Sequence, residues 1–174
     1  MKLLNPIGQF VEVDGKNMNV YIEGSGNKTI VFLSGGGTAS PVLDFKSLYS
    51  LLSDSYKIVV VEKFGYGFSD DYPDRNRDID TVLNDTRTAL SKTGLKTPYI
   101  LCPHSMSGLE AIYWSQKYPE EVEAIIGLDM AVPQYYSDMR ISTAVLKLNK
   151  MLCKVGIIKL FSDNYIKTLY SHSS

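Results

Sequence analysis

The pattern of apolar and polar residues changes along the chain from alternating to continuous. Residues 10–13 and 17–23 alternate on either side of Asp14-Gly15. An Asp-Gly pair between two alternating runs is a strong signal for a tight β-turn. We therefore predict an antiparallel hairpin at one edge of a β-sheet.

Four later runs are apolar without alternation. They are TIVFL at 29–33, KIVVV at 57–61, YILC at 99–102 and VEAIIGL at 122–128. Continuous apolar runs of this length are typical of strands that are buried on both faces, as in a parallel sheet covered by helices. These runs predict the central strands of such a sheet.

Helical patterns separate these strands. Ser40-Pro41 opens the first pattern as cap and first-turn proline, and the second begins after Asp78 and ends at Gly94. The apolar stripes consist of Phe45, Leu48, Tyr49 and Leu52, then Ile79, Val82, Leu83 and Leu90, then Met106, Leu109, Ile112 and Tyr113. Helices that alternate with parallel strands predict an α/β three-layer sandwich with a mostly parallel sheet and right-handed crossovers.

Composition fits one globular unit without a strong electrostatic partner. The chain has 174 residues, of which 44% are apolar, enough for a real core. Its 19 acidic and 18 basic residues leave a formal charge of -1, which favours neither nucleic acid nor an anionic membrane. We expect a small molecule or a protein as partner.

The cysteines and the N-terminus predict a location in the cytoplasm. Cys102 and Cys153 have no metal-ligand spacing, so we interpret them as buried thiols in a reducing compartment. Asn5-Pro6 interrupts the apolar start too early for a signal peptide. No apolar stretch approaches the roughly 18 residues of a membrane span.

The stretch LCPHSMSGLE, residues 101–110, is the strongest candidate for chemistry. Ser105 falls directly after a predicted parallel strand and at the start of a predicted helix. The carboxyl ends of parallel strands face the ligand crevice, and a helix start supplies N–H groups to a developing oxyanion. Ser105 is therefore either a nucleophile on a sharp turn or only a helix N-cap.

This stretch resembles the nucleophile elbow of the α/β-hydrolase family, G-x-S-x-G. Pro103 and Ser107 replace the two motif glycines here, and Gly108 follows. Ser107 is small, and a proline fixes φ and ends a strand. The elbow is thus altered but recognisable.

Two further segments, each at a strand end, strengthen the resemblance, which covers residues 9–132. VFLSGGGTASP, residues 31–41, is similar to the family's H-G-G-G-type oxyanion loop, and VVVEKFGYGFSD, residues 59–70, is similar to its D-x-x-G-x-G-x-S loop. In this chain the matching residues are Ser34 in the histidine position, Gly35, Gly36 and Gly37, and then Glu62 in the acidic position, Gly65, Gly67 and Ser69.

The resemblance implies a serine hydrolase without a cofactor or metal. Ser105 would be the nucleophile, and the N–H groups of Met106 and of Gly36 or Gly37 would bind the oxyanion. Asp129, at the end of the last predicted strand, is the candidate acid. The implied substrate is an ester, amide or thioester of a small apolar molecule.

The general base has no evident candidate. His104 precedes the nucleophile, a position that points away from the serine in this family, and His172 lies in a stretch that resembles the start of a cap. We interpret residues 1–132 as the N-terminal part of the core and residues 133–174 as a helical cap segment, with the last core strands absent. We therefore expect a truncated chain with little or no turnover.

Other interpretations stay open. The glycine run could cradle a phosphate, but it lacks both the third glycine of a dinucleotide site and a G-K-[ST] motif. The chain could also be a non-catalytic domain of the same fold that binds a ligand or partner, an inactive fragment, or a catalyst of carbon–carbon or carbon–halogen chemistry. Residues 151–161 predict a cap helix over the crevice, and an exposed apolar cap or sheet edge would favour self-association.

Overall fold

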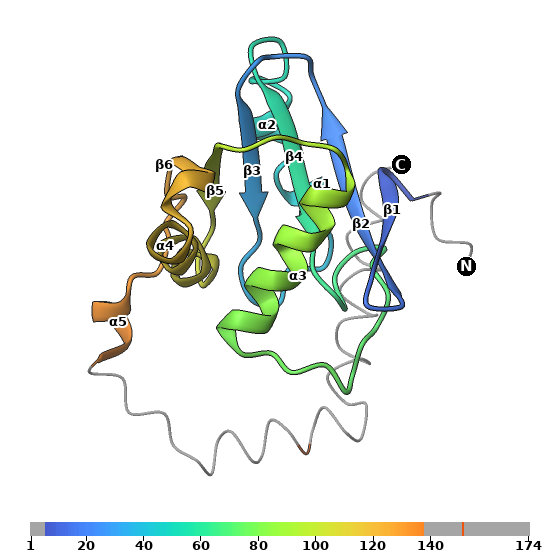
Figure 1. Cartoon of the computed structure of the whole chain (residues 1–174), viewed down its shortest axis with the longest axis vertical. Helices are drawn as coiled ribbons and strands as arrows, with labels where there is room; N and C mark the ends of the chain where they lie inside the picture. Colours follow the sequence, from blue (N-terminus) through green and yellow to red (C-terminus); the bar gives the residue numbers. More distant parts are fainter. Residues whose placement is uncertain (1–5, 138–150, 152–174) are drawn as a thin grey trace, which may run out of the picture. The chain divides into compact units, whose positions relative to one another are not determined.

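A computed structural model of the chain describes residues 6–137 and residue 151 (Figure 1). The chain divides into two compact units, Met1–Pro133 and Gln134–Ser174. The sheet and its covering helices belong to the first unit. Cys153, His172 and most of the predicted cap segment lie outside the described residues.

The first unit is built on a six-stranded mixed sheet with the order β1-β2-β4-β3-β5-β6. β1 pairs antiparallel with β2, and β2 pairs antiparallel with β4, whereas β3, β4, β5 and β6 are mutually parallel. The strands are β1 (Gln9–Val13), β2 (Lys16–Glu23), β3 (Thr29–Leu33), β4 (Lys57–Glu62), β5 (Tyr99–Pro103) and β6 (Val122–Ile125). The prediction of a mostly parallel sheet with an N-terminal antiparallel hairpin is confirmed.

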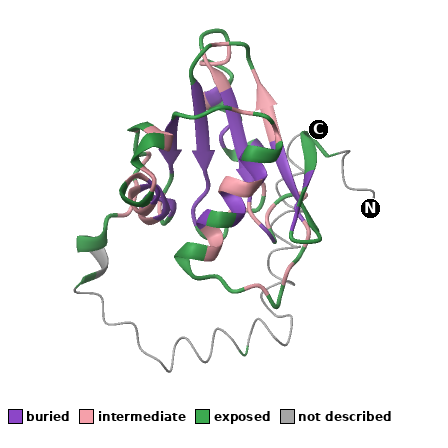
Figure 2. Cartoon of the chain, in the orientation of Figure 1, coloured by how far each residue is buried: buried purple, intermediate pink, exposed green. Residues whose placement is uncertain are grey.

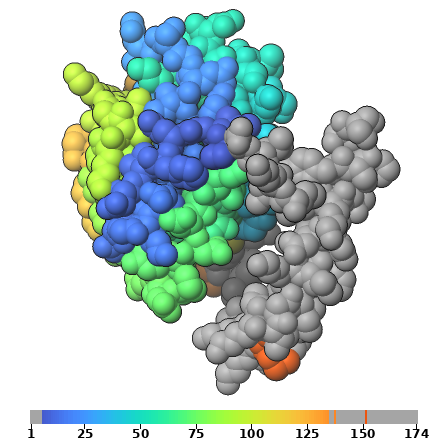
Figure 3. Space-filling view, turned by 90° about the vertical axis from the view of Figure 1, so that its right-hand side faces the viewer, coloured from blue at the N-terminus to red at the C-terminus, as the bar shows by residue number. Residues whose placement is uncertain are grey.

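The hairpin turn has the backbone that the Asp-Gly pair predicts. Asp14 has φ +53° and Gly15 has φ +75°, as a type I′ turn requires at both central positions. In the space-filling view (Figure 3), the hairpin (blue) lies against the segment that precedes α3 (green). The Asn17 N–H donates to an Asp70 carboxylate oxygen at 2.8 Å, which ties the hairpin to that segment.

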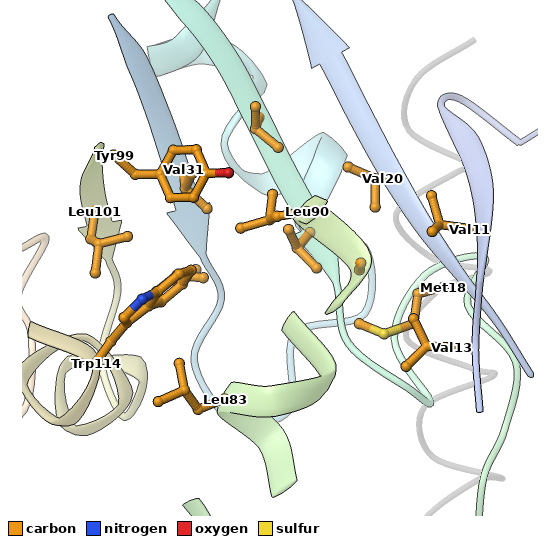
Figure 4. Packing of buried hydrophobic residues seen from close by; sticks show 14 of the residues in the cluster. Val11, Val13, Met18, Val20, Val31, Leu83, Leu90, Tyr99, Leu101 and Trp114 are labelled. Carbon is orange, nitrogen blue, oxygen red and sulfur yellow. The ribbon is translucent and has the colours of Figure 1, made fainter. Parts of the chain in front are cut away.

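Two apolar cores lie on opposite faces of the sheet because successive residues of each buried strand point to opposite sides. On one face, Val31 and Leu33 pack with residues of α3 (Ile79–Lys92) and α4 (Ser107–Lys117), as Figure 4 shows in part. On the other face, Phe32 packs with residues of α1 (Pro41–Asp44) and α2 (Lys46–Tyr49). The central strands are buried along nearly their whole length (Figure 2), and the three-layer α/β architecture is confirmed.

Two of the three predicted helices differ from their patterns. α3 agrees: it begins after Asp78, whose side chain accepts a hydrogen bond from the Thr81 N–H at 2.8 Å. The first helical pattern forms two four-residue helices that meet at Phe45, and the Ser40 side chain makes no capping bond.

α4 buries a different face from the predicted apolar stripe. Met106 is 54% exposed, and the other three stripe residues are only partly buried. The inner face of α4 consists largely of small residues, which let the helix approach its neighbours closely, and of a glutamate whose carboxylate is buried in an ion pair. Apolar character therefore does not mark this face. The buried residues are Ser107, Gly108, Glu110, Ala111 and Trp114.

The last predicted strand is shorter and more exposed than expected. β6 covers only Val122–Ile125, and none of its residues is fully buried, because it is the edge strand of the described sheet. Beyond it, the Ile126 and Leu128 N–H groups still donate to Leu101 and Pro103 of β5, each at 2.8 Å. The segment after β6 therefore stays beside the end of β5.

The elements after α4 are short: a 3-10 helix at Pro119–Glu121 leads into β6, and α5 (Pro133–Ser137) follows the loop after it. None of the helices in the described part of the chain has the length and apolar character needed to cross a bilayer.

Candidate active site

Ser105 lies on a sharp turn between β5 and α4. Its φ is +53°, a left-handed conformation that costs a residue with a side chain about 1–2 kcal/mol. The Ser105 carbonyl accepts hydrogen bonds from Gly108 N at 3.0 Å and from Ala131 N at 2.8 Å. These bonds hold the unfavourable backbone, which is the pattern expected of a strained functional turn.

Ser107 replaces a motif glycine and adds a bond of its own. Its side chain is buried, and its Oγ lies 2.6 Å from the Leu33 carbonyl oxygen, to which it can donate. The same Oγ accepts a hydrogen bond from His104 N at 2.9 Å. Ser107 thus fastens the turn to the end of β3, so the loss of the glycine is structurally compensated.

The glycine loop after β3 lies directly against the Ser105 turn. A Cβ atom on Gly35 would lie 2.8 Å from Ser105 Cβ, closer than packing allows, and would make a tight 3.1 Å contact with the His104 carbonyl oxygen. Only glycine therefore permits this approach of the two backbones. The sequence resemblance points to Gly36 or Gly37 and assigns no separate role to Gly35.

The N–H groups around the serine differ in their availability. The Gly37 N–H donates to the Tyr66 hydroxyl at 3.2 Å. By contrast, the Gly36 and Met106 N–H groups donate to no acceptor among the described residues. Met106 Sδ lies 3.2 Å from where a Gly36 Cβ would be, so the Met106 side chain packs against Gly36.

Glu62, in the acidic position of the loop after β4, is a structural anchor. Its carboxylate is fully buried and accepts hydrogen bonds from Phe68 N at 2.7 Å and Asn19 Nδ2 at 2.9 Å. The Ser69 hydroxyl donates to the Glu62 carbonyl oxygen at 2.5 Å and accepts from Asn19 N at 2.8 Å. This network holds the loop that carries Lys63 and Tyr66 toward the glycine loop.

Lys63 and Glu110 form a buried ion pair that sequence analysis missed. Lys63 Nζ lies 2.5 Å from Glu110 Oε2 and donates to the Ser34 carbonyl oxygen at 3.2 Å. The Thr86 hydroxyl donates to Glu110 Oε1 at 3.0 Å. In the sequence, each of these residues is a charged residue within an apolar segment. This pattern does not reveal that the two side chains meet.

Among the described residues, the remaining candidates do not complete a catalytic triad. The His104 side chain is exposed, and its ring packs edge-on against Phe45 with a centroid distance of 6.3 Å. Asp129 is also exposed, with φ +46°, on a segment whose Leu128 and Ala131 bond to the Ser105 backbone. The structure thus brings the backbone near Asp129 to the serine, and the Ser105 hydroxyl forms no hydrogen bond with a histidine among the described residues.

Burial raises the pKa of the Cys102 thiol to about 11, so it is an unreactive core residue. Partial burial raises the pKa of the Asp44 carboxyl, and nearby His104 opposes that shift.

No group of three or more His, Cys, Asp or Glu side chains that could hold a metal ion occurs within the described residues. Two shallow hollows lie along α3, and neither is lined by the Ser105 turn.

The chain is similar in sequence to known proteins. The chain is 56% identical over 140 residues to the uncharacterized protein YbdG of Bacillus subtilis, an alignment that covers 80% of this chain and 43% of YbdG. It is 27% identical over 123 residues to the 2-(acetamidomethylene)succinate hydrolase of Mesorhizobium japonicum, which covers 71% of this chain and 42% of that enzyme.

The fold is similar to that of solved structures as well. The crystal structure of Cfl2 from Burkholderia cenocepacia superposes with a TM-score of 0.67 and 25% identity, over 78% of this chain and 46% of Cfl2. The chain therefore spans less than half the length of these proteins. A family model described as the alpha/beta hydrolase fold matches residues 28–144. With the strained serine turn and the glycine loop in place, the chain belongs to the α/β-hydrolase family.

Proposed function

We propose that this chain carries the nucleophile half of a serine hydrolase, with Ser105 as the attacking residue. The observation that carries the proposal is the left-handed Ser105 at the start of α4, with the Gly35 backbone packed directly against it. A serine presented in this way is accessible to a substrate and adjacent to backbone N–H donors, as acyl transfer requires.

In the proposed reaction, Ser105 Oγ attacks the acyl carbon while a base takes its proton. The N–H groups of Gly36 and Met106 bind the oxyanion of the tetrahedral intermediate. We favour Gly36 over Gly37 because the Gly37 N–H already donates to Tyr66. The leaving group departs after protonation, and water then hydrolyses the acyl-enzyme by the same route.

Asp129 is the proposed acid that would orient the base. Its segment is bonded to the Ser105 backbone on both sides, through the Leu128 carbonyl oxygen and the Ala131 N–H. His172 lies outside the described residues. Because a triad without its base retains only a small part of its rate, we expect weak turnover unless a histidine reaches Ser105.

The proposed substrate is an ester, amide or thioester of a small apolar molecule. Met106 supports this choice because its side chain is 54% exposed beside the Gly36 backbone, which offers an apolar contact next to the reacting atoms. The similar enzyme from Mesorhizobium japonicum is named as a hydrolase, which supports the same reaction type.

A non-catalytic, ligand-binding role is the second candidate. The observation that favours it is the position of His104, the only histidine among the described residues, whose ring packs on Phe45. In that case the serine turn would be a feature of the fold without a catalytic role. The surface around it would bind a ligand but not convert it.

Labelling with a fluorophosphonate probe, followed by intact mass measurement, tests the proposal. We expect a single adduct on the wild-type chain and on Ser115→Ala, a control serine on α4, and no adduct on Ser105→Ala. If the folded wild-type chain forms no adduct, Ser105 is not activated and the non-catalytic role is favoured. An adduct that persists on Ser105→Ala would also refute the proposed nucleophile.

A further inference from the structure

The buried ion pair between Lys63 and Glu110 joins three segments of the site. Lys63 directly follows β4, Glu110 lies on α4, and the Ser34 carbonyl oxygen that Lys63 contacts begins the glycine loop. The exposed fraction is 14% for the lysine side chain and 5% for the glutamate side chain. The pair is therefore largely buried, and it contacts the start of the glycine loop.

An ion pair in this position is costly to bury, so stability alone does not explain it. Desolvation of two charges can exceed their mutual attraction, and apolar residues of similar size are often as stable or more stable. The geometry offers another role, because the lysine contacts the start of the glycine loop and the glutamate lies on α4, the helix that directly follows Ser105 and Met106. The pair thus spans the two segments that carry the proposed oxyanion donors.

The glycine loop is held at both of its ends by the loop after β4. Lys63 donates to the carbonyl oxygen of Ser34, just before the glycines, and the Tyr66 hydroxyl accepts from the N–H of Gly37 at their end. Gly36 lies between these two contacts, and its own N–H has no acceptor among the described residues. The direction of the Gly36 N–H therefore depends on the contacts that hold the residues on either side of it.

We propose that Lys63 is a positioning residue that holds the Gly36 N–H in its oxyanion-binding direction, and that Glu110 fixes Lys63 from α4. The inference rests on the proposed function of Ser105. Neither side chain contacts the substrate, and their effect reaches the reaction through the Ser34 carbonyl. This positioning role would explain why a lysine and a glutamate occur in otherwise apolar segments.

Three variants separate positioning from folding. Lys63→Met removes the donor to Ser34 but leaves the buried Glu110 without its cation, so we expect a clear loss of thermal stability. Lys63→Met/Glu110→Met removes both charges, and the Thr86 hydroxyl, which donates to Glu110 in the wild type, can donate instead to the Val82 carbonyl oxygen 3.0 Å away. Lys117→Met is the matched control, because it breaks an exposed ion pair with Asp80 at the far end of α4.

The first readout is the mobility of the glycine loop, measured by ¹⁵N relaxation on the whole chain. In the double variant we expect the melting temperature to recover toward that of the wild type. We expect the order parameter of the Gly36 amide to fall from a rigid value of about 0.85 to about 0.6 or below. If the ion pair served stability alone, the melting temperature and the Gly36 order parameter of the double variant would both return toward their wild-type values. An unchanged Gly36 order parameter in the double variant would overturn the proposal.

The second readout is the rate of fluorophosphonate labelling of Ser105. We expect labelling to slow about tenfold or more in the double variant and to stay at the wild-type rate in Lys117→Met, because a misplaced oxyanion donor is costly. Equal rates in all variants would contradict the proposal. If the wild type is not labelled at all, the proposed function fails, and the relaxation measurement still decides whether Lys63 positions the loop.

Discussion

At the scale of single residues, Ser105 holds a backbone conformation that its side chain disfavours. The bonds from Gly108 and Ala131 to the Ser105 carbonyl show how the surrounding structure maintains a φ of +53°. Glycine would accept this conformation without the steric cost that a Cβ atom imposes. The hydroxyl at this position therefore comes at the expense of stability, which supports the proposed role of Ser105.

Two substitutions measure this cost. Ser105→Gly and Ser105→Ala both remove the hydroxyl, and we expect the glycine variant to be the more stable by about 1 kcal/mol, because only alanine keeps the Cβ strain. Urea unfolding of both variants gives the difference. The same pair of changes at the exposed residue Asn84, within α3, should give the opposite order, since glycine lowers helix stability by about 1 kcal/mol relative to alanine. An alanine variant at least as stable as the glycine variant at residue 105 would argue against strain.

The residues that the sequence could reveal are those with a local signature. Ser105 and the glycine loop were found because each belongs to a short motif at a strand end. The contact between Lys63 and Glu110 was missed because each is isolated in its own segment, and only the fold brings them within 2.5 Å. No spacing rule connects such a pair.

At the scale of elements, the sequence predicts strands better than helix surfaces. The runs at β3, β4 and β5 are apolar on both faces, so their positions follow directly from the pattern. The inner face of α4 does not, because Gly108 approaches Ala131 too closely for a side chain: a Cβ there would lie 2.2 Å from the Ala131 carbonyl oxygen. Close packing through small residues leaves no apolar stripe to detect.

Helix capping supplies a prediction at this scale. Asp78→Ala removes the side-chain bond to the Thr81 N–H, and we expect it to destabilise the chain by about 1 kcal/mol. Ser40→Ala should cost much less, because Ser40 precedes α1 without making a capping bond. Thermal or urea unfolding compares the two. Equal losses would show that the cap contributes nothing beyond the general effect of the substitution.

At the scale of the whole molecule, the two faces of the sheet have separate cores. The face that α3 and α4 cover includes Trp114 and Leu101, whereas the face that α1 and α2 cover includes Phe32 and Cys102. Cys102 thus reports on the second core, and it lies three residues before the serine turn. Its thiol is sensitive to any opening of that core.

Cys102 should react only when this core opens. A thiol with a pKa of about 11 is almost wholly protonated at pH 8, and the thiolate is the reactive form. In a Cys153→Ser background, we expect labelling of Cys102 at pH 8 to be far slower in the native chain than in urea. Rapid labelling of the native chain, at the rate of the unfolded one, would contradict the buried position.

The same burial sets a pH dependence of stability. The folded pKa of Cys102 lies above its ordinary value of 9, so the contribution from the neutral buried thiol is fully present below pH 9 and is lost as the pH rises through about 11. Lysines and tyrosines titrate over the same range, so the comparison is between Cys153→Ser and Cys153→Ser/Cys102→Ala. We expect the difference in unfolding free energy between these variants to shift between pH 8 and pH 10.5 in the direction that disfavours the chain with Cys102. A difference that stays constant over this range would mean that the thiolate is as well solvated in the fold as in the unfolded chain, and that the second core is open to water.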